Sequence, residues 1–177
     1  MNALEDLRSL TALFDHAQPL FQRVEHIPSA VTPEPYQSLL VHDEHMTVSM
    51  ERFHHCTVDV RVLQHRHDGD VYAREILLLK QGTDIPVQYG IVRFHLNYVT
   101  EPVRQEILAR KTPLGRILIN HNVLRHIDLN AILEITAGPG LASALQMPEG
   151  GVTYGRLATI FCNLQPAVDL LEVSTML

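Results

Sequence analysis

Two arginines and a glutamate occupy positions where a strand could turn each of them toward an apolar interior. Arg74 lies in the apolar run Asp70 to Lys80, which has the composition of a central strand covered on both faces. Successive side chains of a strand point to opposite faces, so Arg74 shares a face with Ile76 and points away from Glu75. A buried guanidinium left without a partner costs several kcal/mol in order-of-magnitude terms. We therefore expect Arg74 to meet an anion, which is either another side chain or a ligand carboxylate.

Arg156 and Glu172 follow the same pattern later in the chain. Arg156 shares a strand face with Ala158 and Ile160, and Glu172 shares one with Leu170 near the end of the sequence. The simplest interpretation is that Glu172 pairs with Arg74 or with Arg156 and has no further role. The alternative is that these charges line a ligand site.

The segment Thr112-Pro113-Leu114-Gly115-Arg116 has the composition of a helix start. Free backbone N–H groups and the helix dipole suit a carboxylate at such a place. An ordinary capped helix is the simpler interpretation of this motif by itself.

Eleven histidines raise the question of a metal site. His65 and His67 share a strand face beside the turn pair Asp68-Gly69, but the sequence has no His-Glu-x-x-His motif and no zinc-type spacing. It also lacks a Gly-x-Ser-x-Gly nucleophile motif and a glycine-rich phosphate loop. The sequence thus predicts neither a metal nor an organic cofactor.

Composition narrows the class of protein. The 177 residues are 46% hydrophobic and 19% charged, which is typical of a single globular domain. The net charge of −6 argues against nucleic acid and anionic membranes as partners, while a small anionic ligand needs only a local basic pocket. Cys56 and Cys162 are far apart in the sequence. The first residues from Met1 lack a signal-peptide pattern. No apolar run approaches the ~18 residues of a membrane span. These features predict a cytoplasmic protein with reduced thiols, and they leave its oligomeric state open.

Hydrophobic periodicity and turn residues predict the elements. The expected helices cover Ala3 to His16, Gln37 to His42, Met46 to His55, Val103 to Ala109, Leu114 to Ile119 and Pro139 to Gln146. The expected strands begin after Cys56 and then cover Asp70 to Lys80, Ile85 to Val99, Val123 to Thr136, Val152 to Cys162 and Ala167 to Val173. We expect one α+β domain over residues 1–177, with a single antiparallel sheet of about six strands, helices at its flanks, and 1–34 as an N-terminal helix and irregular connection. The segment Gly138 to Gly151 fits no pattern beyond its short helix.

Four motifs together resemble the chorismate pyruvate-lyase (4-hydroxybenzoate synthase) family. They are His42-Asp43-Glu44-His45-Met46-Thr47, Arg74-Glu75-Ile76-Leu77-Leu78, Thr112-Pro113-Leu114-Gly115-Arg116 and the Pro166 to Glu172 segment, in matching order over roughly residues 35 to 175. Tyr154-Gly155-Arg156 is closer to a divergent branch of the superfamily than to its best-known lyases.

The resemblance implies an antiparallel sheet whose helical flaps close over an internal site. It also implies a lyase that converts chorismate to 4-hydroxybenzoate and pyruvate without a cofactor. It places catalytic roles on Arg74 and Glu172, and ligand contacts on Arg74, Glu172, Met46 and the main chain of Leu114. Arg156 is included with the substrate-binding residues.

A binding protein without catalytic activity is the alternative from a different class. The fold of this family resembles the effector-binding domain of certain bacterial transcription regulators, and a sensor or binder of an aromatic acid would need the same pocket. An enzyme that acts on a relative of chorismate is a further possibility.

Overall fold

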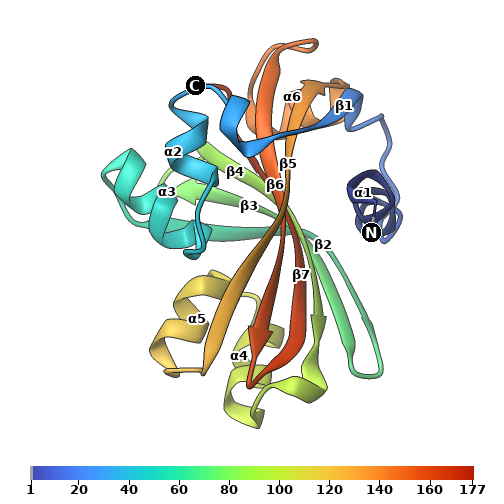
Figure 1. The fold of residues 1–177 in the computed structure, drawn as a ribbon. Helices are drawn as coiled ribbons and strands as arrows, with labels where there is room; N and C mark the ends of the chain where they lie inside the picture. Colours follow the sequence, from blue (N-terminus) through green and yellow to red (C-terminus); the bar gives the residue numbers. More distant parts are fainter. Residues whose placement is uncertain (1) are drawn as a thin grey trace.

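The computed structural model describes residues 2–177, so Met1, which the predicted domain includes, lies outside the described residues. The chain forms one seven-stranded antiparallel sheet with helices on both faces, and the α+β prediction is confirmed (Figure 1). The strands are β1 (Phe21–Ile27), β2 (Val58–Asp68), β3 (Val71–Lys80), β4 (Pro86–His95), β5 (Arg125–Ala137), β6 (Val152–Cys162) and β7 (Gln165–Ser174). The helices are α1 (Ala3–Thr11), α2 (Tyr36–Leu40), α3 (Met46–His54), α4 (Glu101–Ala109), α5 (Leu114–Asn120) and α6 (Pro139–Leu145), with short 3₁₀ turns at Ser29–Val31 and Leu96–Tyr98. This architecture is the chorismate lyase-like fold.

The two faces of the sheet carry separate cores. Helices α1 and α6 pack their leucines on one face, against residues such as Leu133, Leu157 and Leu171. Helices α2, α3, α4 and α5 cover the other face, where the polar positions Arg74 and Glu172 also lie. Figure 1 shows α1 on one side of the sheet and α2, α3 and α5 on the other. Burial on both faces explains why β3 and β4 are apolar almost throughout.

The sheet has one strand more than expected, because the segment between Pro19 and Pro28 contains β1. β1 pairs antiparallel with β5 at the edge of the sheet. Its polar interior, Gln22 to His26, is half exposed and gives no clear alternation. An edge strand that carries charge is therefore easily mistaken for the irregular connection predicted here.

The order β1-β5-β6-β7-β4-β3-β2 also corrects the expectation that Asp70 to Lys80 is the central strand. The middle position belongs to β7, the last strand in the chain, and β3 is second from the edge. A strand is apolar when it has a neighbouring strand on each side and both of its faces are covered. A strand second from the edge meets these conditions as well as a central one, so composition does not indicate its position in the sheet.

The segment Gly138 to Gly151, which the sequence pattern leaves without an assignment beyond its helix, joins β5 to β6 through α6. It packs against the residues before β1: the Gly138 N–H donates to the Leu20 carbonyl at 2.9 Å. A Cβ on Gly138 would lie 2.6 Å from the Pro19 carbonyl oxygen, so glycine is required by this close approach of two backbones.

Candidate functional site

A closed cavity lies between the sheet and its helical cover. It measures about 30 Å³, roughly the volume of one water molecule. Its floor includes Arg74 from β3, Gln88 and Gly90 from β4, and Glu172 from β7. Its roof is the first turns of α3 and α5, including Met46 and Leu114. The structure therefore brings together four of the residues singled out from the sequence, Arg74, Met46, Leu114 and Glu172, from four separate elements.

Arg74 is a buried cation without an acid partner. Its side chain is 0% exposed, and Nη2 donates only a long hydrogen bond of 3.4 Å to the carbonyl of Thr112. Nε and Nη1 have no hydrogen-bond partner among the described residues. The guanidinium also lies 5.4 Å from the centre of the Phe94 ring.

Burial lowers the pKa of Arg74 to about 10, so the guanidinium still carries its charge at neutral pH. Of the two partners that the sequence allows, the acidic side chain is not found within residues 2–177. A ligand anion is the other partner that the sequence allows.

Glu172 pairs with Arg156 and not with Arg74. The Nε of Arg156 donates to Glu172 Oε2 at 2.7 Å, and the two residues face each other across the β6–β7 ladder. Arg156 does not line the cavity. Its other donors reach the carbonyls of His42 and Glu44, each at 3.0 Å, and tie the loop before α3 to the sheet. Glu172 still lines the cavity as one member of a buried ion pair.

The roof is closed by a direct approach of α5 to α3. A Cβ on Gly115 would lie 2.8 Å from Thr47 Oγ1 and 2.9 Å from the Cβ of His45. Arg116 and Glu51 form an ion pair between the same two helices. The contact between α3 and α5 therefore restricts access to the cavity from this side.

His45 and Gln88 are polar lining residues that the sequence reasoning missed. His45 precedes α3 and accepts a hydrogen bond from Arg125 Nε at 2.7 Å. Burial, with Arg125 and Arg156 nearby, lowers the pKa of His45 to about 4, so the ring is neutral at physiological pH. It separates the cavity from an outer pocket of about 410 Å³. Gln88 could have been found by the rule that singled out Arg74, because it is a lone polar residue on an apolar strand face.

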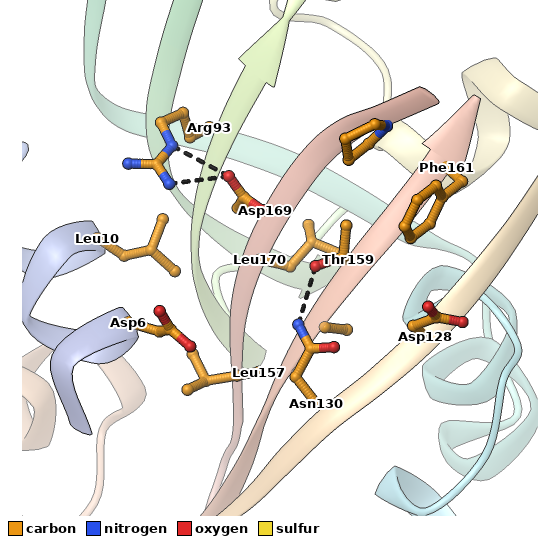
Figure 2. A pocket seen from close by; sticks show the side chains of 12 residues that line it. Asp6, Leu10, Arg93, Asp128, Asn130, Leu157, Thr159, Phe161, Asp169 and Leu170 are labelled. Carbon is orange, nitrogen blue, oxygen red and sulfur yellow. Dashed lines mark hydrogen bonds and ion pairs between the residues drawn. The ribbon is translucent and has the colours of Figure 1, made fainter. Parts of the chain in front are cut away.

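A larger hollow, of about 370 Å³, lies on the opposite face between α1 and the sheet (Figure 2). Two pairs of its polar side chains are already matched. Arg93 donates to Asp169 Oδ2 at 2.8 Å and 3.1 Å, and Asn130 donates to Thr159 at 2.8 Å. Figure 2 shows the members of each pair joined by dashed lines. The smaller cavity is the better candidate because only there is a buried charge left without a partner.

Within residues 2–177, no three or more histidine, cysteine, aspartate or glutamate side chains are grouped so that they could hold a metal ion. The prediction that the protein needs no metal or cofactor stays a prediction. No helix in the same part of the chain is long and apolar enough to cross a membrane.

No protein-family profile matches the sequence, and no curated protein matches it significantly. Solved structures do match the fold. The effector domain of PhnF from Mycobacterium smegmatis is 10% identical, with a TM-score of 0.52 over 75% of this chain and 88% of that domain. A structure of PhnF from the same organism is 10% identical, with a TM-score of 0.50 over 74% of this chain and 63% of that one.

The ligand-binding domain of a putative GntR-family transcriptional regulator from Bordetella bronchiseptica is 14% identical, with a TM-score of 0.47 over 66% of this chain and 85% of that domain. At such identities the likeness concerns the fold alone. What can be stated is the fold, which is chorismate lyase-like, and the small internal cavity under α3 and α5.

Proposed function

We propose that the protein binds a small anionic molecule, of the aromatic acid type, in the cavity under α3 and α5, and that it acts as a binding or sensing protein. The observation that carries this proposal is Arg74, which is fully buried, charged at neutral pH and left with two free donors. A carboxylate can accept from either free donor, and it can form a bidentate pair if it also takes Nη2, whose present hydrogen bond to Thr112 is long.

The other walls fit a ring rather than a second anion. Met46, Ile76 and Leu114 are apolar and buried, and they surround the space beside Arg74. The PhnF effector domain has the same fold, and its name describes a domain that responds to an effector. This supports a binding role for the same kind of cavity here.

Cleavage of chorismate is the second candidate function, and it depends on Glu172. Glu172 lines the same cavity as Arg74, as the resemblance to the lyase family requires. Its carboxylate, however, is held at 2.7 Å by Arg156. A carboxylate in a buried ion pair is a poor proton donor, because protonation would leave Arg156 as an unpaired buried charge. The geometry therefore favours binding over acid catalysis.

The test compares parent protein with Arg74→Ala and Arg74→Lys by calorimetry, using benzoate and its neutral analogue benzamide as probes. We expect the parent to prefer benzoate. Arg74→Ala should lose benzoate binding while keeping its fold, and Arg74→Lys should recover little because lysine lacks the planar fork. Equal benzoate affinity in the parent and the alanine variant contradicts the proposal.

Incubation of the parent with chorismate, with pyruvate and aromatic product followed together, separates the two candidate functions. Binding without pyruvate release supports the binding protein. Stoichiometric release of both products above the uncatalysed rate, lost in Glu172→Gln, supports the lyase.

A further inference from the structure

Gln88 is a second buried polar group that points into the cavity without a partner. Its side chain is 2% exposed, it lines the cavity, and Oε1 makes no hydrogen bond to any described residue. A buried amide acceptor without a partner is costly, and such groups are rare in folded proteins. Its position is therefore informative in the same way as that of Arg74.

The strand register places the two groups at opposite ends of the cavity floor. Arg74 pairs with Val92 across the β3–β4 ladder, and Gln88 pairs with Leu78, four residues farther along β3. At the strand rise of ~3.4 Å per residue, the two rows lie about 14 Å apart at the backbone. Both side chains extend into the same cavity, so the gap between their polar atoms is shorter than this.

The row between them has its smallest residue at the centre. It contains Ile76, Gly90 and Glu172 side by side. Gly90 adds no side chain to the floor, and a Cβ there would lie 3.3 Å from Ile76 Cγ1. The floor thus has a cation at one end and an amide at the other, and Ile76 packs over Gly90 between them.

We infer that Gln88 is the second recognition group of this site, and that the ligand carries a hydrogen-bond donor, a hydroxyl or an amino group, at the end remote from its anion. This inference rests on the proposed function, because it takes the anion to lie on Arg74. Oε1 is the fully buried atom of Gln88 that lacks a partner. An amide oxygen accepts hydrogen bonds, so it favours ligands that can donate one over ligands that can only accept.

Glu172 is the rival for the same donor, since it is the other acceptor on the floor. One of its oxygens is already bound by Arg156. Glu172→Gln therefore serves as a comparison variant, which should weaken recognition of the donor less than the loss of Gln88 does.

The experiment measures four probes by calorimetry at one pH and salt concentration: benzoate, para-hydroxybenzoate, para-aminobenzoate and para-methoxybenzoate. We expect the parent to bind the hydroxy or the amino compound about tenfold more tightly than the methoxy compound, the size of one matched buried hydrogen bond. The difference between the first two identifies which donor the site takes.

Gln88→Met keeps the length of the side chain and removes its amide. We expect the preference for the donor probes to disappear in this variant while benzoate affinity stays close to that of the parent. Its ligand-free melting temperature should not fall, because an unmatched polar group has been removed. Gln64→Met is the matched control: Gln64 is an amide that donates to Glu75 and Asp15 outside the cavity, so its loss should lower stability without changing the probe preference.

Four results overturn the inference, and they differ in what else they overturn. A parent that binds benzoate through Arg74 without preferring a donor, or a Gln88→Met variant that keeps the preference, removes the role of Gln88 alone. A parent that prefers the methoxy probe shows that the amide donates, and it also contradicts the inference. A parent that binds none of the four probes overturns the proposed function and this inference with it.

Discussion

At the scale of single residues, Arg156 and Arg74 have opposite roles. Both lie on the sheet face that α2, α3, α4 and α5 cover. Arg156 is satisfied, because Glu172 and the carbonyls of His42 and Glu44 take its donors. Arg74 is unsatisfied, with one long contact to Thr112. The same residue type on the same kind of strand thus anchors a loop in one case and is free to bind a ligand in the other. Only the partners distinguish the two roles.

His45 provides a prediction at this scale. Its folded pKa of about 4 lies below the ordinary value of 6.5, chiefly because burial disfavours the charged ring. Above pH 6.5 the ring is neutral whether the chain is folded or unfolded. Between 6.5 and 4 the unfolded chain takes up the proton first, so stability is lost as the pH falls. The expected loss is about 3 kcal/mol between pH 7 and pH 4.

The measurement is urea unfolding of the parent and of His45→Gln over this pH range. Glutamine keeps an acceptor for Arg125 but does not titrate, so the variant should lose less stability on acidification. His26→Gln, on the exposed side of β1, should retain the full pH dependence of the parent. Identical pH profiles for the parent and His45→Gln would contradict the buried, neutral histidine.

At the scale of elements, α3 and α5 form a roof that must open. They touch at Gly115, and they are linked by the ion pair between Arg116 and Glu51. The loop before α3 is fixed to the sheet by Arg156, so α3 has an anchor at its N-terminal end. This arrangement favours a hinged movement of the helices over their complete release. The proposed organic acid requires such a movement, because the cavity measures only about 30 Å³.

Gly115→Ala tests the closed roof. The added methyl group would overlap with Thr47 and His45, which must shift, and overpacking of this kind costs about 1–3 kcal/mol. We expect faster amide hydrogen exchange in α3 and α5 and unchanged exchange in α1 and α6. A variant with parent-like exchange in both roof helices would show that the contact at Gly115 does not hold them together.

At the scale of the whole molecule, the sequence is informative where chemistry interrupts a strong pattern. A charge within an apolar strand is enough to single out Arg74 and Glu172, because the alternation of strand faces is nearly obligatory. The edge strand β1 escapes prediction because its polar, half-exposed residues carry little pattern. The partner of Glu172 cannot be fixed from the sequence either, since the choice between Arg74 and Arg156 depends on strand order. Strand order is set by long-range pairing, and local composition does not indicate it.

The central claim is that Arg74 is kept unpaired for a ligand at the expense of stability. Thermal unfolding of the parent and of Arg74→Met, each with and without saturating benzoate, tests this most directly. Methionine fills similar space without a charge, and replacing buried charges with well-packed apolar groups is often neutral or stabilising. The ligand-free variant should therefore melt at the same temperature as the parent or higher.

Benzoate at a hundred times its dissociation constant should stabilise only the parent, by about 2.7 kcal/mol, which is roughly 5–10 °C for a chain of this size. In the presence of benzoate, the parent should then melt at a higher temperature than Arg74→Met. An Arg74→Met protein that is several degrees less stable without ligand, and that gains as much from benzoate as the parent, would contradict the claim.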